Sequence, residues 1–273
     1  MTIVVMTREM GTLGKDVARE FARRMGYSVI HHELVRKPGD KPAYSEESEV
    51  YRFLEDSERK IEEWRNNRAQ SGFLTKSELL EIALEGEVLI RGWGAARLLK
   101  SVPNVLSVRV CAPMAFRIEV MKKRLGVDAQ TARREIERND AAHGRTFLRF
   151  FQDDWRNPEN YDLVLNTEHI EPSTCAEILV DAARATSFAE SEETRAVLDD
   201  MLLTARIDEA LQGAGLSGRR NEHIDVVVNG DDIRLYGVVK DRTKRSLAEN
   251  VLAREFGISR FQNDILYTRG CGE

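Results

Sequence analysis

The chain has 273 residues, of which 42% are hydrophobic and 32% charged, and its formal net charge is −5. These values predict a soluble globular protein with one large or two modest domains and exclude an intrinsically disordered chain. The negative net charge argues against nucleic acid as a partner, because a protein that binds nucleic acid needs a basic surface. No apolar run of about 18 residues and no basic leader before an apolar core is visible, so we expect no membrane span and a cytoplasmic location.

No metal site built from protein residues alone is expected. Cys111, Cys175 and Cys271 are far apart and odd in number, so they predict neither a zinc site nor a disulfide framework. The triplet His31-His32-Glu33 does not predict a metal site either, because adjacent residues on an extended chain point to opposite faces.

A glycine-punctuated turn joins the first apolar strand to an amphipathic helix. Gly11 and Gly14 let the backbone approach a phosphate, turn amides and the helix N-terminus bind its oxygens, and Lys15 adds a positive charge. A strict P-loop reads G-x-x-x-x-G-K-[ST], whereas here Glu9 holds the first glycine position and Asp16 the hydroxyl position. The residues alone leave two interpretations open, a phosphate cradle or a tight turn that needs small residues.

Strands alternate with helices over the first two thirds of the chain. The expected strands are residues 3–7, 27–30, 87–90, 105–110 and 161–166, and the expected helices are 15–25, 76–84, 95–99, 114–124 and 175–185. This alternation predicts an α/β fold, a parallel sheet with helices on both faces. Ligands of such sheets bind at the carboxyl ends of the strands, where the glycine turn, Gly92-Trp93-Gly94 and Ala112-Pro113 all fall.

A further helix is expected at residues 46–68, with Ser45 as its N-cap. Its apolar residues between Val50 and Trp64 approximate a coiled-coil seam between charged flanks. Two interpretations remain, a subunit-pairing helix of a homodimer or lid support, and a plain amphipathic helix packed on the core.

The composition changes at residues 185–194, which read as a linker into a second, smaller unit. Its expected elements are a helix at 192–212, strands at 224–228 and 232–239, a helix at 244–256 and a strand at 261–267, and Asn229-Gly230 predicts a hairpin. We therefore expect two domains, residues 1–187 and 192–268. Residues 190–273 hold 12 basic and 16 acidic side chains, so an anionic membrane is not an expected partner.

The first 185 or so residues resemble the cytidylate-kinase-like family of P-loop nucleoside monophosphate kinases. The pieces that carry this resemblance are residues 7–15, 88–95, Ala112-Pro113 with Phe116-Arg117, 138–145 and 154–167. The C-terminal unit resembles a BON domain through residues 224–226 and 232–239. That second resemblance implies a small binding module, with an unknown ligand or protein as its partner.

The kinase resemblance implies a P-loop kinase fold that uses ATP and Mg²⁺ to phosphorylate a small-molecule acceptor. The implied cofactor-binding residues are Arg8, Gly11, Thr12, Gly14, Lys15 and Asp16. Arg8 reaches a phosphate or only pairs with Glu9, and Asp16 would hold Mg²⁺ through water. The implied catalytic residues are Lys15 and the lid arginines Arg138 and Arg145, with Asp140 orienting one of them. They fall in the basic segment 117–149, which has nine Lys+Arg and five Asp+Glu.

The implied acceptor site departs from the family pattern. Cytidylate kinases carry Gly-Arg-Asp after the third strand, whereas this chain has Gly92-Trp93-Gly94. The acceptor-binding candidates are therefore Arg91, Trp93, His32 and Arg117. Arg91 would replace the missing guanidinium, and Trp93 either stacks on a flat group or fills the sheet-helix interface.

Three functions fit these observations. The first is an ATP-dependent kinase acting on a nucleoside monophosphate or a similar acceptor. The second is a nucleotide-binding regulatory protein with little or no turnover that signals through the BON-like domain. The third is a scaffold, in which the 46–68 helix and the BON-like domain drive assembly.

Overall fold

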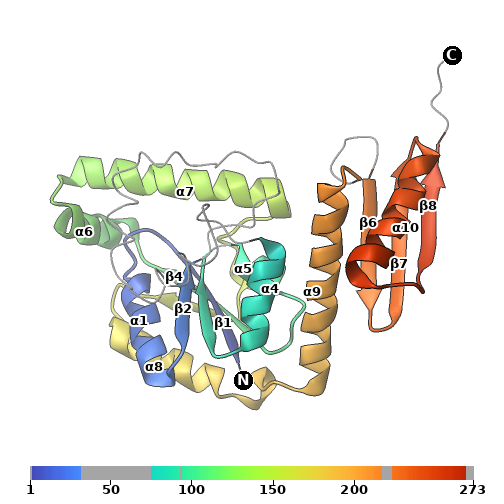
Figure 1. Ribbon diagram of the computed structural model, residues 1–273. Helices are drawn as coiled ribbons and strands as arrows, with labels where there is room; N and C mark the ends of the chain where they lie inside the picture. The colour runs from blue at the N-terminus through green and yellow to red at the C-terminus, as the bar shows by residue number, and fades with distance from the viewer. Residues whose placement is uncertain (1, 32–74, 93, 217–222, 269–273) are drawn as a thin grey trace. The chain divides into compact units, whose positions relative to one another are not determined.

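A computed structural model describes residues 2–31, 75–92, 94–216 and 223–268 of the chain (Figure 1). These residues form two compact units: residues 2–31 and 85–190 belong to the first, and residues 75–84 and 191–268 to the second. The expected helix at 46–68 lies outside the described residues, so its suggested role in a homodimer stays a prediction. The site candidates His32 and Trp93 also lie outside them. No helix of the described part is long and apolar enough to cross a membrane.

A five-stranded parallel sheet forms the centre of the first unit, with the strand order β2-β3-β1-β4-β5. Its strands are β1 (Ile3–Arg8), β2 (Ser28–His31), β3 (Val88–Arg91), β4 (Val105–Cys111) and β5 (Leu163–Asn166). Residues 3–7 of β1 are buried, as expected for a central strand covered on both faces. The α/β fold predicted from the alternation of strands and helices is confirmed.

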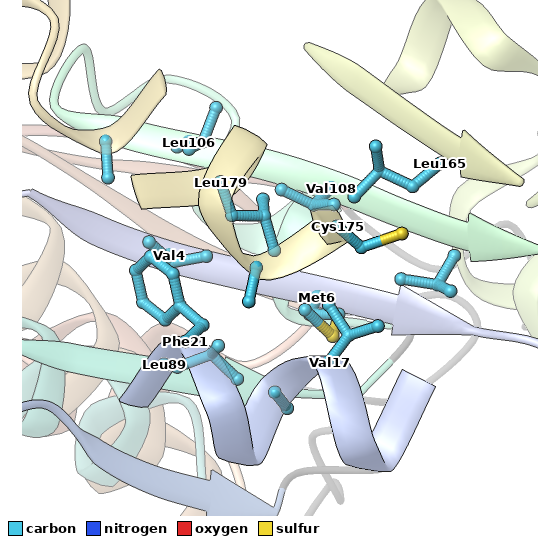
Figure 2. Packing of buried hydrophobic residues seen from close by; sticks show 14 of the residues in the cluster. Val4, Met6, Val17, Phe21, Leu89, Leu106, Val108, Leu165, Cys175 and Leu179 are labelled. Carbon is cyan, nitrogen blue, oxygen red and sulfur yellow. The ribbon is translucent and has the colours of Figure 1, made fainter. Parts of the chain in front are cut away.

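Two helices cover one face of this sheet, α1 (Gly14–Met25) and α8 (Pro172–Ala183). Helix α1 ends as expected at Gly26, whose φ of 75° suits glycine. Figure 2 shows the apolar cluster between these helices and the strands. Its labelled members are Val4, Met6, Val17, Phe21, Leu89, Leu106, Val108, Leu165, Cys175 and Leu179. The short helix α5 (Ala95–Leu98) contacts β1.

Two further helices, α6 (Met114–Leu125) and α7 (Ala129–Phe151), pack on each other and bury Met10 of the glycine turn between them. Helix α7 is capped by Asp128, which accepts a hydrogen bond from the Thr131 amide. Helix α7 is not among the helices predicted from the sequence. Its buried positions follow helical spacing, but they include Asp140 and His143, so the apolar periodicity is weak.

The second unit is a small α+β unit, as predicted. It contains α9 (Glu192–Gly213), β6 (His223–Asn229), β7 (Asp232–Val239), α10 (Arg242–Phe256) and β8 (Gln262–Tyr267). Strands β6 and β7 form the expected antiparallel hairpin, and β8 pairs with β7 in parallel. A capping box at Ser191 begins α9. Before it, the hydroxyl of Thr2 donates to the carbonyls of Ala183 and Phe188, which ties this stretch to the first unit.

Helix α4 (Lys76–Glu85) belongs to the second unit although it lies between β2 and β3 in the sequence. Thr75 and Glu78 form a reciprocal capping box at its start. The carboxylate of Glu209 in α9 accepts hydrogen bonds from the Ser77 amide at 3.1 Å and from the Ser77 hydroxyl at 2.7 Å. The second unit therefore includes a segment that the sequence analysis placed in the first domain.

Two adjacent carboxylates of α9 are expected to affect stability in opposite directions. Burial, with some contribution from Asp225 and Glu209, raises the pKa of Asp208 to about 6. Folding thus favours its neutral form, so this group lowers the stability as the pH rises from about 4 to 6, and the penalty is complete above pH 6. At pH 8, Asp208→Asn should raise the free energy of unfolding by about 1 kcal/mol after allowance for solvent screening.

Glu209→Gln is the matched change, because it also replaces one carboxylate by an amide. It should lower the free energy of unfolding by about 1–2 kcal/mol, since charge-assisted hydrogen bonds to Ser77 are lost. Urea unfolding of both variants at pH 8 and pH 4.5 measures the two effects. A destabilised Asp208→Asn variant at pH 8 would contradict the assigned penalty.

Candidate functional site

The loop between β1 and α1 turns sharply at two residues with left-handed backbone. Gly11 has a φ of 82°, and Leu13, the residue before α1, has a φ of 57°. A Cβ atom on Gly11 would lie 2.8 Å from the carbonyl oxygen of Arg117, so the loop rests directly on the backbone of α6. Only glycine fits this position, on grounds of both space and backbone conformation.

Protein donors take the carbonyl oxygens of this loop. The Glu9 carbonyl accepts from the Thr12 hydroxyl at 2.8 Å, and the Met10 carbonyl accepts from Nε of Arg117 at 2.7 Å. The Thr12 carbonyl accepts from the Thr167 hydroxyl at 2.7 Å. Since all peptide bonds of the loop are trans, each amide lies opposite the carbonyl of its own peptide group.

The loop amides are thereby turned away from these donors. Among the described residues, no turn or loop hydrogen bond to a backbone carbonyl is found for the amides of Gly11, Leu13 and Gly14. The amides lead into the N-terminus of α1, where the helix dipole favours an anion. Amides directed away from protein acceptors at a helix N-terminus favour the interpretation of a phosphate cradle over that of a merely tight turn.

Lys15 lies among other cations at the end of the loop. Burial lowers the pKa of its ammonium group, and the nearby guanidinium groups of Arg91, Arg19 and Arg124 lower it further, while Asp16 raises it. Four cations thus lie near one carboxylate, that of Asp16, and the remaining positive charge favours an anionic ligand. The cluster therefore has the charge that a nucleotide polyphosphate requires.

Asp16 occupies the position of the P-loop hydroxyl. Its carboxylate contacts Arg19 at 3.4 Å and Arg124 at 3.6 Å, and these cations offset its charge. A partly exposed carboxylate suits Mg²⁺ held through water. The described residues contain no group of three or more His, Cys, Asp or Glu side chains that could hold a metal ion without a substrate.

Arg91 ends β3 and is 4% exposed. It pairs in register with Met6 of β1, and the following amide of Gly92 donates to the Met6 carbonyl at 2.9 Å. The hydroxyl of Thr7 donates to the Gly92 carbonyl. These contacts hold the end of β3 beside the end of β1, so the predicted acceptor residue Arg91 lies near Lys15.

A buried ion-pair network lies behind the loop. Glu9 is 5% exposed; it is paired with Arg109 of β4, and its Oε2 lies 3.0 Å from Arg117 of α6. Arg117 forms a two-pronged contact with Asp140 of α7 at 2.8 and 2.9 Å, and Arg156 adds a third bond to Asp140 at 2.9 Å. Glu9 therefore faces arginines rather than the cradle, and the fork partner of Asp140 is Arg117.

The predicted lid arginines lie elsewhere on α7. Arg138 and Arg145 are exposed, whereas the buried residues of α7 are Ala132, Ile136, Asp140, His143 and Phe147. At 100° per residue, the two arginines project from the side opposite the buried one. No ion pair involving either is found among the described residues. The structure thus gathers Gly11, Thr12, Gly14, Lys15, Asp16 and Arg91 at one place, without Arg138 and Arg145.

The match that decides the family spans this site. Residues 3–169 match the model of the "Cytidylate kinase-like family", which is more than half of the chain. The chain belongs to the cytidylate kinase-like family. Membership links it in general terms to phosphoryl transfer to a small substrate, for which kinases use ATP and Mg²⁺. No curated protein matches the chain.

Solved structures give only weak likenesses to this family member. An uncharacterized protein from Eubacterium ventriosum ATCC 27560 is 16% identical with a TM-score of 0.49, covering 68% of this chain and 99% of its own. A shikimate kinase from Bacteroides thetaiotaomicron is 12% identical with a TM-score of 0.37, covering 67% and 99%. A gluconokinase from Sinorhizobium meliloti 1021 is 16% identical with a TM-score of 0.31, covering 66% and 94%.

His143 of this cytidylate kinase-like chain lies on the buried side of α7. Burial and, to a smaller extent, the nearby Arg8 lower the pKa of its imidazole to about 4, although Asp140 acts to raise it. The ring is therefore neutral at physiological pH and adds no charge to the site. It meets the indole of Trp155 edge-on, with ring centroids 5.8 Å apart. The side chain of Arg8, a predicted phosphate contact, lies against Gly14, where an added Cβ atom would come within 2.9 Å of the Cβ and 3.2 Å of the Cδ of Arg8.

Sequence reasoning missed two cations of the cluster, Arg19 and Arg124. Arg124 belongs to the basic segment 117–149, but nothing in the sequence alone distinguishes it from Lys122 or Lys123. Arg19 follows Lys15 by four residues, a spacing that places both on one side of α1 and offered a usable signal.

Proposed function

We propose that the first unit is an ATP-dependent, Mg²⁺-using kinase that phosphorylates a nucleoside monophosphate or a similar small acceptor. The loop carbonyls taken by protein donors, together with the cations around Lys15, are the observation that carries this proposal. Phosphoryl transfer depends mainly on positioning and on positive charge at the transferring group. When bound, ATP supplies the phosphoryl group and Mg²⁺ offsets phosphate charge.

The residues of the chain divide the work as follows. The amides of Gly11 and Gly14 bind phosphate oxygens, and Lys15 stabilises the charge that develops on the transferring group. Asp16 would hold Mg²⁺ through water. The proposal assigns further charge stabilisation to Arg91 rather than to Arg138 and Arg145, because the latter project from the outer side of α7.

The acceptor is proposed to differ from that of a dedicated CMP kinase. The turn Gly92-Trp93-Gly94 lacks the arginine and aspartate of the family motif, and Arg91 is the guanidinium available in their place. Of the other candidates predicted from the sequence, Trp93 and His32 are proposed as further acceptor contacts. Arg117 does not, because Nε and both terminal nitrogens already donate to protein groups.

The second candidate is a nucleotide-binding regulatory protein with little or no turnover. Asp16 in the hydroxyl position favours it, because a carboxylate near the phosphates opposes tight nucleotide binding. In this reading the second unit serves as a BON-like module that passes nucleotide occupancy to a ligand or protein. Its element order, α9-β6-β7-α10-β8, supports a BON-like assignment.

Lys15→Ala tests the proposal directly. ATP with Mg²⁺ should raise the melting temperature of the wild-type chain by mass action, and Lys15→Ala should remove most of that increase without lowering the stability of the apo protein. Lys123→Ala is the matched control, since Lys123 is an exposed lysine of α6. Differential scanning fluorimetry over a range of ATP concentrations measures all three proteins.

Equal stabilisation of the wild type and Lys15→Ala by ATP would contradict the proposed site. A phosphoryl-transfer screen with CMP, dCMP, UMP and AMP then separates the two candidates. Turnover of any acceptor that falls by about 10²-fold or more in Lys15→Ala supports the kinase. Binding that depends on Lys15 without turnover supports the regulatory protein.

A further inference from the structure

We propose that Arg117 is the positioning residue of the phosphate-binding loop, fixing the direction of the Gly11 amide and tying the loop to α7. The inference rests on the proposed function for its consequence, nucleotide affinity. It starts from one contact, in which Nε of Arg117 donates to the Met10 carbonyl at 2.7 Å. The P-loop pattern names glycines, a lysine and a hydroxyl residue, and none of these makes this contact.

A single peptide plane links Arg117 to the cradle. The carbonyl of Met10 and the amide of Gly11 belong to one trans peptide group, so they point in opposite directions. By holding the carbonyl outward, Arg117 holds the amide inward. Gly11 tolerates many backbone conformations, so without this restraint its amide would sample several directions.

The side chain of Arg117 is itself immobilised. It is 4% exposed, and its two terminal nitrogens donate to the carboxylate of Asp140 at 2.8 and 2.9 Å. Oε2 of Glu9 lies 3.0 Å from one of them. Two buried carboxylates offset the charge of this guanidinium, and its planar fork fits Asp140 as a lysine could not.

The network also explains why Glu9 and Asp140 are acidic. Glu9 holds the first glycine position of the P-loop pattern, yet its charge is directed to Arg109 and Arg117 instead of the cradle. Asp140 comes from the buried side of α7 and carries no contact with Arg138 or Arg145 among the described residues. Both residues therefore position the loop through Arg117.

Hydrogen exchange of the apo protein tests the geometry, using Arg117→Lys in the full chain. The exchange of the loop amides that are hydrogen-bonded, those of Thr12, Asp16 and Val17, should accelerate about tenfold or more, because the loop opens more often without its anchor, while amides of the central strand β1 keep their wild-type rates. Arg156→Ala is the control, since Arg156 also binds Asp140 but its side chain is 48% exposed, and no hydrogen bond or ion pair between that side chain and the loop is found among the described residues. It should leave the loop amides unchanged.

Affinity for ATP with Mg²⁺ gives the second measurement. Arg117→Ala should weaken binding about tenfold, added guanidinium should restore most of the loss, and Arg156→Ala should bind like the wild type. Unchanged loop exchange in Arg117→Lys, or equal acceleration over the whole first unit, would overturn the inference. A wild type that binds no ATP would instead refute the proposed function, and the apo exchange result would still decide the inference.

Discussion

Replacing Gly11 by alanine is expected to abolish ATP binding and to lower the free energy of unfolding of the first unit by roughly 2–4 kcal/mol. Two costs add: the φ of 82° disfavours a side chain, and the new Cβ atom would lie 2.8 Å from the Arg117 carbonyl oxygen. That oxygen is part of the α6 backbone and cannot rotate away. The loop must therefore shift, which misdirects the amides of the proposed cradle.

Gly26→Ala is the matched control for this prediction. Gly26 has a similar φ of 75°, but no atom lies within 4 Å of its would-be Cβ atom. It should cost about 1 kcal/mol from backbone strain alone and leave ATP binding intact. Urea unfolding and ATP titration of both variants make the comparison. Comparable costs with retained ATP binding in both would show that close contact with α6 does not shape the site.

The central fold could be predicted because its signals are local. The apolar strand, the glycine turn and the amphipathic helix predicted from the sequence are all present in the structure. The Asn229-Gly230 hairpin also depends only on neighbouring residues. Helix α7 was not delimited because its buried side carries Asp140 and His143, which weaken the apolar pattern. The placement of α4 depends on Glu209, 132 residues beyond Ser77, which no local pattern reveals.

The site residues, too, could be predicted only where the signal lies in the local sequence. The glycines and Lys15 were found because the P-loop pattern names their positions. The role of Glu9 was not predicted, because a carboxylate in a glycine position suggests that the P-loop motif has degenerated. The structure shows instead that Glu9 pairs with Arg109 and Arg117. Ion-pair partners lie at long sequence separations, and charge alone does not say which arginine pairs with which carboxylate.

The largest structural effect is expected from Gly237→Ala in β7, the central strand of the second sheet. A Cβ atom there would lie 2.1 Å from the carbonyl oxygen of His223 in β6, and the φ of 141° is unfavourable for alanine. We expect a loss of about 4 kcal/mol or more, enough to unfold a marginal α+β unit. Gly230→Ala at the hairpin should cost only about 1 kcal/mol, because the added Cβ atom would meet no atom of another part of the chain within 4 Å.

The same variant tests whether the two units fold independently. The first unit keeps its own sheet and apolar cluster, so ATP with Mg²⁺ should still raise the temperature of its unfolding transition in Gly237→Ala, measured by calorimetry. Helix α4 is the element through which unfolding of the second unit would affect the first, because it belongs to the second unit but lies between β2 and β3 in the chain. Loss of the ATP-dependent transition in Gly237→Ala, but not in Gly230→Ala, would mean that the second unit supports the nucleotide site through α4. The assignment of ATP binding to the first unit alone would then fail.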